Sequence, residues 1–129
     1  MYRPPAFAPW SSDDLEFLEL KNTGTNTLDL SGLIFTAGLD FAFTNGTRLA
    51  PGVFFVLARN PIAFAARYPG VAISGLYSNK LDNGGEKLTL SHVLGTNVFS
   101  VAYDNATPWP LTPDGLGFSL VRANLTDDS

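Results

Sequence analysis

The sequence predicts an all-β domain, and three features of its composition point to this class. Its 129 residues include 10 Phe, 12 Gly and 9 Pro, which favours short strands joined by frequent turns. Almost no stretch has helical periodicity. Apolar residues make up 45% of the chain and charged residues 16%, a balance that allows a buried core and excludes a disordered acidic tail.

The length and the cysteine content of the chain further limit the classes of protein to which it can belong. We expect one domain over residues 1–129, of which residues 124–129 form a polar, linker-like tail. No apolar run approaches the roughly 18 residues of a membrane-spanning helix. The chain has no Cys and one His, which excludes a disulfide framework, a thiolate nucleophile and the usual Cys/His zinc sites. No cofactor is expected.

The first half of the chain carries three predicted strands. Residues 15–22 alternate as in a half-buried strand, with Leu18 and Leu20 on one face. After the turn sequence NTGTNT, residues 28–36 resume the strand pattern. Beyond the Asn-Gly and Pro-Gly turn signals, residues 53–58 are apolar on both faces, so this strand is expected to lie centrally or under a covering element.

A short helix is predicted near residues 60–68 as that cover. Asn60 is a good N-cap, Pro61 suits the first helical position, and Pro69-Gly70 ends the pattern. Phe64 and Tyr68 fall on one face of this helix.

The second half predicts further strands, which gives about eight short strands in all and the spacing of an immunoglobulin-like β-sandwich. They are expected at residues 71–78, 87–93, 98–103 and 118–122. The apolar strand positions should form one core between two sheets, made of Leu18, Leu20, Leu30, Phe41, Phe43, Val56, Leu88, Leu90 and Val101.

Four motifs in order resemble the lamin tail domain. LEFLELKNTGTNTLDLSGLIFT is similar to its first signature, in which E-L-x-N, here Glu19 to Asn22, precedes D-L-S-G, here Asp29 to Gly32. LAPGVFFVLA, LDNGGEKLTL and VFSVAYD resemble the later motifs. The resemblance covers residues 1–124 and implies an immunoglobulin-like sandwich with a binding or tethering role. The bacterial members, modules of large exported proteins, are the most similar.

In that bacterial group an M-Y-x-P sequence ends the first strand, which Met1 to Pro4 would match. The resemblance therefore implies that most of the first strand lies upstream of Met1. Without it a sheet edge is unpaired, and the Pro-rich segment 4–9 cannot donate hydrogen bonds along it. We expect self-association into a homo-oligomer through that edge.

The sequence does not favour an enzyme. Glu16 and Glu19 are three apart in the predicted strand, so they point to opposite faces and cannot flank one bond; the pleat predicts outward-facing carboxylates instead. Ser91 and His92 also point to opposite faces, and no Gly-x-Ser-x-Gly motif exists. His92 is expected to be a surface or partly paired histidine.

Two acidic loops are weak calcium candidates. Asp82 and Glu86 flank an Asn-Gly-Gly turn, and Asp104 with Asp114 offers a second set of oxygen ligands. Neither has the alternating acidic ladder of a calcium loop, and turn formation is the favoured interpretation, so no metal is expected.

Nucleic acid is not an expected partner, because the basic residues are dispersed and the net charge is −4. Aromatic residues near turns suggest weak binding candidates, of which we single out Trp109, Tyr103 and Tyr77, with Trp10 and Phe118 as further ones. Rim residues that close the sandwich are the favoured interpretation of these rings.

We therefore expect a noncatalytic interaction or tethering module of an exported multidomain bacterial protein, which positions neighbouring domains or binds a surface partner. The expected location is extracellular or at the cell surface, although no signal peptide is visible in this segment. The alternative is a carbohydrate-binding module that uses exposed aromatic residues near Trp109 and Tyr103.

Overall fold

A computed structural model describes residues 1–117 and 119 of the chain. Eight strands form three sheets, with the strand orders β1-β5-β6, β2-β4 and β3-β7-β8. The first sheet consists of β1 (Phe17–Lys21), β5 (Phe54–Ala58) and β6 (Gly75–Leu76). The small sheet pairs β2 (Leu28–Asp29) with β4 (Arg48–Leu49), and the third contains β3 (Leu33–Ala37), β7 (Gly85–His92) and β8 (Asn97–Asp104).

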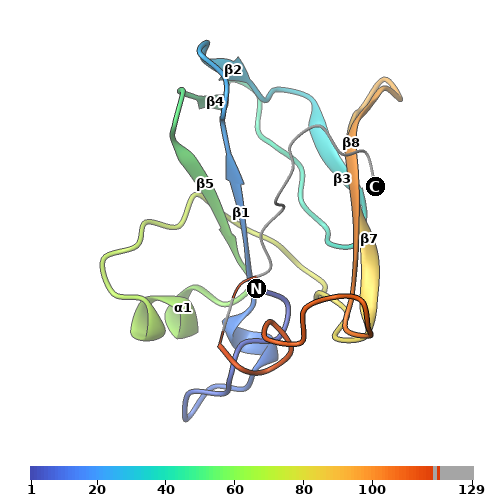
Figure 1. Cartoon of the computed structure of the whole chain (residues 1–129). Coiled ribbons are helices and arrows are strands. Elements are labelled where there is room, and N and C mark those ends of the chain that lie inside the picture. The colour runs from blue at the N-terminus through green and yellow to red at the C-terminus, as the bar shows by residue number, and fades with distance from the viewer. Residues whose placement is uncertain (118, 120–129) are drawn as a thin grey trace.

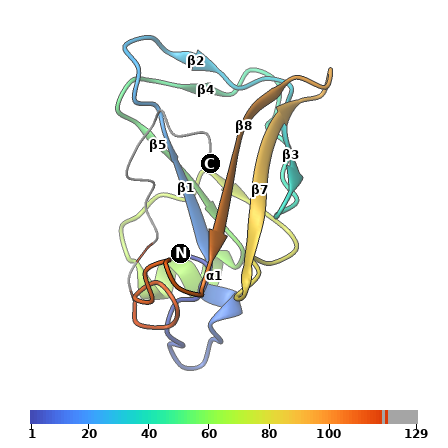
Figure 2. The same cartoon turned by 45° about the vertical axis from the view of Figure 1, so that its right-hand side comes forward.

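The two three-stranded sheets face each other, as predicted for an immunoglobulin-like sandwich (Figure 1). The β2-β4 pair bridges one end, and the N-terminus, the 3-10 turn η1 (Asp13–Leu15) and the helix α1 (Pro61–Arg67) lie toward the other (Figures 1 and 2). The predicted strand Phe118–Arg122 lies outside the described residues.

The central position predicted for residues 53–58 is confirmed for β5. It pairs antiparallel with β1, from Phe17 opposite Ala58 to Lys21 opposite Phe54, and parallel with β6. The helix predicted near residues 60–68 is also confirmed. The Asn60 side chain caps α1 by accepting hydrogen bonds from the backbone N–H groups of Ile62 and Ala63 at 3.1 and 3.2 Å.

The predicted strand over residues 28–36 is divided in two, because the chain changes sheets inside it. β2 pairs with β4, and β3 pairs with β7. Gly32 makes the turn between them with φ +77°, and a Cβ atom there would lie 2.6 Å from Nε2 of His92. This position therefore requires glycine, and the alternating pattern on either side hides the break.

The strand predicted over residues 71–78 is reduced to Gly75–Leu76. The Ser74 hydroxyl, rather than a backbone carbonyl, accepts a hydrogen bond from the N–H of Val56 at 3.0 Å. By Ser78 the chain has left this sheet, since Ser78 and Asp40 exchange both backbone hydrogen bonds at 3.2 Å. The segment thus crosses from one side of the sandwich toward the other.

The core differs from the prediction in two respects: four of the nine residues are only partly buried, and Val56 lies in a separate cluster. Leu30, Phe43, Leu88 and Leu90 are buried in one cluster between the sheets; Leu18, Leu20, Phe41 and Val101 are partly buried against it. Val56 belongs to a second cluster with Ala58 and Phe64, on the outer face of β5 beneath α1. Side chains alternate along β5, and a strand buried on both faces therefore contributes to two clusters.

Candidate functional site

Glu16 is buried, and the prediction that it faces outward is wrong. It follows η1 and precedes β1, and its side chain is 0% exposed. Its Oε2 accepts hydrogen bonds from the backbone N–H of Leu81 at 3.0 Å and from the Tyr77 hydroxyl at 3.3 Å. Because β1 begins only at Phe17, the alternation of a strand does not govern Glu16. Glu19, within β1, is exposed.

Burial raises the pKa of Glu16 to about 7, although its hydrogen bonds from Leu81 and Tyr77 oppose the rise. Burial and the nearby Glu16 carboxylate also raise the pKa of Tyr77. Among the described residues Glu16 Oε1 has no hydrogen-bond partner. Through these hydrogen bonds Glu16 holds the segment 77–81 against the start of β1.

Tyr77 and Tyr103, the weak binding candidates, are both buried, with Tyr103 only 7% exposed. The Tyr103 ring stacks on Tyr2 with 4.7 Å between centroids. Its hydroxyl donates toward the Asp82 carbonyl at 2.7 Å and also lies 3.1 Å from Glu86 Oε1. Neither tyrosine therefore offers a ring face to a ligand in this structure.

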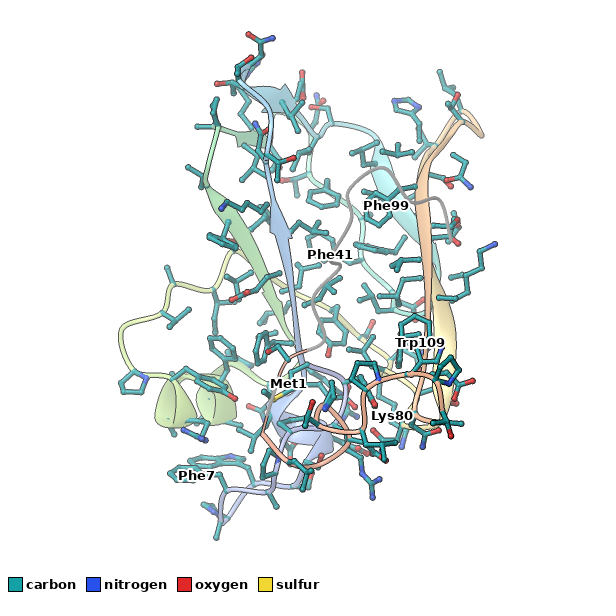
Figure 3. All side chains as sticks on the ribbon, in the orientation of Figure 1. Met1, Phe7, Phe41, Lys80, Phe99 and Trp109 are labelled. Atoms are coloured by element: carbon teal, nitrogen blue, oxygen red, sulfur yellow. The ribbon has the colours of Figure 1, made fainter. Side chains whose placement is uncertain are left out.

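Trp109 is half-buried and packs against the core between the sheets. Figure 3 shows it in the loop that follows β8. Trp10 stacks on Phe7 with 6.5 Å between ring centroids and 9° between planes. In Figure 3 Phe7 lies outside the sandwich, at the end opposite the β7–β8 turn. The candidate Phe118 lies outside the described residues.

The acidic residues considered as calcium ligands stabilise turns or form an ion pair instead. Oδ1 of Asp82 accepts a hydrogen bond from the N–H of Gly84 at 2.7 Å, and Glu86 Oε1 accepts one from the N–H of Asp82 at 2.9 Å. Asp104 caps the next turn, and Asp114 pairs with Arg3 at 2.6 Å. Within residues 1–117 and 119, no three His, Asp or Glu side chains gather as a metal ligand set.

Ser91 and His92 form no catalytic pair in the structure. Ser91 is buried with its hydroxyl 3.5 Å from that of Thr36. His92 is half-buried, and its Nδ1 accepts a hydrogen bond from the N–H of Leu94 at 3.1 Å. The imidazole thus shapes the turn that follows β7.

The end of the sandwich that carries β2 and β4 contains an open apolar cleft of about 430 Å³. It is lined by residues of both large sheets and of the small one: Leu20, Lys21, Leu28, Asp29, Leu30, Leu33, Phe43, Leu49, Leu90, Val98 and Phe99. Phe41 and Phe99 point into the space between the two sheets in Figure 3. Lys21 and Asp29 are the charged residues of the lining.

Exposed apolar side chains lie at the same end of the sandwich; Leu28 and Val98 line the cleft, whereas Phe54 is on the outer face of β5 with Val56. Six of the large exposed hydrophobic residues lie at this end, on β2, at the start of β5 and on the β7–β8 hairpin: Leu28, Val53, Phe54, Val93, Leu94 and Val98. Of these, Val98 is 51% and Leu94 86% exposed. We call the cleft and these six residues the apolar end.

Sequence reasoning missed both the apolar end and the buried Glu16. Apolar residues flank the turn at Gly95, where polar residues are the usual choice, and this was the available indication of exposed apolar surface. For Glu16, the indication was its position between Leu15 and Phe17, two large apolar residues.

The family model described as Lamin Tail Domain matches residues 5–105. No curated protein is significantly similar to the chain. Among the described residues, no helix is long and apolar enough to cross a membrane.

Proposed function

Because the chain belongs to the lamin tail domain family, an immunoglobulin-like domain type, we propose that it is a noncatalytic interaction or tethering module. We place it in an exported multidomain bacterial protein, outside the cell or at its surface. There it positions neighbouring domains or binds a surface partner. The four-motif resemblance to the bacterial members supports this setting.

The observation that carries the proposal is the apolar end. Soluble monomers rarely expose contiguous apolar patches beyond a few hundred Å², and larger ones mark interaction sites. Here a cleft of about 430 Å³ opens between the sheets with the exposed side chains of Leu28 and Val98 in its lining, and four more exposed large apolar side chains lie at the same end. The lining of the cleft is apolar apart from Lys21 and Asp29, so an apolar protein surface is the ligand chemistry that it fits.

The opposite end supports a structural role instead. Its titratable groups, among them Glu16, Tyr77 and Glu86, are satisfied mainly by one another and by backbone groups. The carbohydrate-binding alternative relies on exposed aromatic residues near Trp109 and Tyr103, but Tyr103 is buried and Trp109 is half-buried against the core, and we therefore do not favour it. The dispersed basic residues give no support for nucleic acid as a partner.

Site-specific photocross-linking tests the proposal. A benzoylphenylalanine at position 98, at the apolar end, is compared with one at position 62 on α1, where Ile62 is 72% exposed. In cells that produce the whole protein, position 98 should form cross-links to protein and position 62 should not. Equal yields at both positions, or none at position 98, would contradict the proposal.

A further inference from the structure

We propose that Asn45 is a site of spontaneous covalent modification, at which the side-chain amide is lost through a cyclic imide formed with the backbone nitrogen of Gly46. The hydroxyl group of Ser31 slows this reaction. The inference is independent of the proposed function, since it concerns the chemistry of one turn and not a binding surface.

The reaction needs only water as a second reactant. The nitrogen of Gly46 attacks the side-chain carbonyl carbon of Asn45. A bond between this nitrogen and that carbon forms, the bond from the carbon to Nδ2 breaks, and ammonia leaves with the proton of the Gly46 nitrogen. Water then adds to either carbonyl of the imide and breaks its bond to nitrogen, which gives aspartate or isoaspartate. Glycine favours the attack, because no Cβ atom crowds the nitrogen.

Three pairs of Asn or Asp followed by Gly occur in residues 1–117, and the structure distinguishes them. The first, Asn45-Gly46, is the exposed centre of a turn that the N–H of Thr47 closes by donating to the Thr44 carbonyl at 3.2 Å. Gly46 has φ +84°, and a Cβ atom there would meet no described atom beyond the adjacent residues within 4 Å. Water therefore reaches the reacting atoms, and ammonia can leave.

The second pair, Asn83-Gly84, lies at the centre of a similar turn but is less accessible. The N–H of Gly85 donates to the Asp82 carbonyl at 3.3 Å and closes this turn. The side-chain oxygen of Asn83 is buried, and among the described residues it has no hydrogen-bond partner. In the reaction this oxygen becomes negatively charged, and an oxyanion needs hydrogen-bond donors or water to stabilise it. Asn83 should therefore react more slowly than the exposed Asn45.

The third pair, Asp114-Gly115, is held by Arg3. The Arg3 guanidinium pairs with the Asp114 carboxylate at 2.6 Å, and the N–H of Gly115 donates to the Arg3 carbonyl at 3.0 Å. An ionised carboxylate is also a poorer electrophile than an amide. This pair should therefore be the least reactive of the three.

Ser31 restrains the nitrogen that must attack. The N–H of Gly46 donates to the Ser31 hydroxyl at 2.7 Å, and this hydroxyl donates to Oδ1 of Asp29 at 2.6 Å. Asp29 also accepts a hydrogen bond from the backbone N–H of Ser31 at 3.0 Å, which fixes the serine in place. The attacking nitrogen must lose the proton that it shares with Ser31, so this hydrogen bond has to break first. The D-L-S-G motif, to which Asp29 and Ser31 belong, therefore protects the turn.

The first experiment follows both Asn-Gly pairs in the purified, folded chain. The protein is incubated at mildly alkaline pH in water enriched in heavy oxygen, digested, and analysed by mass spectrometry. Asn45 should gain heavy oxygen and form isoaspartate at least about tenfold faster than Asn83, the factor expected for a buried oxygen without donors. In urea the two rates should become similar, and Asn45→Gln should lose the signal of its peptide.

Two results of this experiment would overturn the proposal. One is a folded chain in which Asn83 reacts as fast as Asn45, or in which Asn45 does not react. The other is a difference between the two sites that persists in urea, because the fold would then not be its cause.

The second experiment tests Ser31. Ser31→Ala should raise the rate at Asn45 about fivefold, the effect of losing one hydrogen bond, and should leave the rate at Asn83 unchanged. Ser11→Ala is the matched control, because it also removes a hydroxyl that donates to a carboxylate, that of Asp14, at 2.7 Å. It should change neither rate. An unchanged or lower rate at Asn45 in Ser31→Ala, or equal acceleration at both sites, would overturn the role of Ser31.

Discussion

The two ends of the sandwich are built from the same two sheets but differ in their side chains. At the end near the N-terminus, buried polar groups meet one another: Glu16 accepts from Tyr77 and Leu81, and Tyr103 bonds to the Asp82 carbonyl. At the apolar end, an open cleft lies between the sheets and has the exposed apolar side chains of Leu28 and Val98 in its lining.

This contrast indicates which end stabilises the fold and which end is free for association. Buried polar groups are costly when they lose a partner, so the closed end is sensitive to substitution. An exposed apolar side chain contributes little to folding, since it stays in water in the folded state. The closed end should therefore determine stability, and the apolar end should determine association.

The largest effect is expected for Tyr103→Ala. The change removes a buried ring stacked on Tyr2 and the hydroxyl that donates to the Asp82 carbonyl. We expect the free energy of unfolding to fall by about 3–5 kcal/mol. Urea denaturation measures it. Leu94→Ala at the apolar end is the control and should change it by less than about 0.5 kcal/mol. Similar losses in both variants would remove the distinction between the ends.

Glu16→Gln should change how stability depends on pH. The folded state raises the pKa of Glu16 from 4.5 to about 7. Its stabilising contribution is therefore complete below pH 4.5 and is lost as the pH rises through 7. This difference corresponds to about 3 kcal/mol at most. Above pH 7 the glutamine variant should be the more stable protein.

Urea denaturation at pH 5 and pH 8 measures this effect. Wild type should lose stability relative to Glu16→Gln between the two values. The comparison of the two proteins is needed because burial lowers the pKa of the Met1 amino group to about 6, which stabilises both proteins as the pH rises over the same range. Glu19→Gln, a change of the same kind at an exposed position on β1, should behave as wild type. A wild-type pH dependence that survives in Glu16→Gln would show that another group causes it.

Asn22→Ala tests the support of the apolar end. Asn22 is buried, and its Nδ2 donates to the carbonyls of Leu49 and Asn26 at 2.8 Å. These bonds tie the end of β1 to β4, beside the cleft. Losing them should cost about 2 kcal/mol. Asn26→Ala, with an exposed side chain, should cost little. Equal melting temperatures of the two variants would contradict a supporting role for Asn22.

The smallest effect is expected at the edge of β1. Met1 and Phe17 exchange both backbone hydrogen bonds, at 2.7 and 3.3 Å. A chain extended upstream would continue along β1 toward Glu19 and Lys21 in this register. We predict weak self-association through this edge that disappears when about ten residues, the length of a generous strand, are added before Met1. Sedimentation of both proteins measures it, and identical monomers would contradict it.

Much of the fold followed from the sequence, and the exceptions have physical causes. Capping at Asn60 and the apolar run of β5 predicted α1 and the central strand, because these signals are local. The break at Gly32 and the crossing at Ser74 were missed, since each depends on a distant partner: His92 in one case and Val56 in the other.

The candidate site was less predictable than the fold. Trp109 packs partly buried against the core, and Tyr77 and Tyr103 are too deeply buried to offer a ring face in this structure. Periodicity tells which face a strand residue occupies only when the residue lies within a strand, and Glu16 does not.

The sequence by itself determined the class of the protein: short strands with alternating apolar positions, strong turns and four ordered motifs specify an immunoglobulin-like member of the lamin tail domain family. Only the tertiary structure decided which end of the sandwich is closed and which is open. That choice depends on how far two sheets separate and on which loops cover their ends. Both are set by contacts between residues distant in the chain, such as Glu16 with Leu81, rather than by any local pattern.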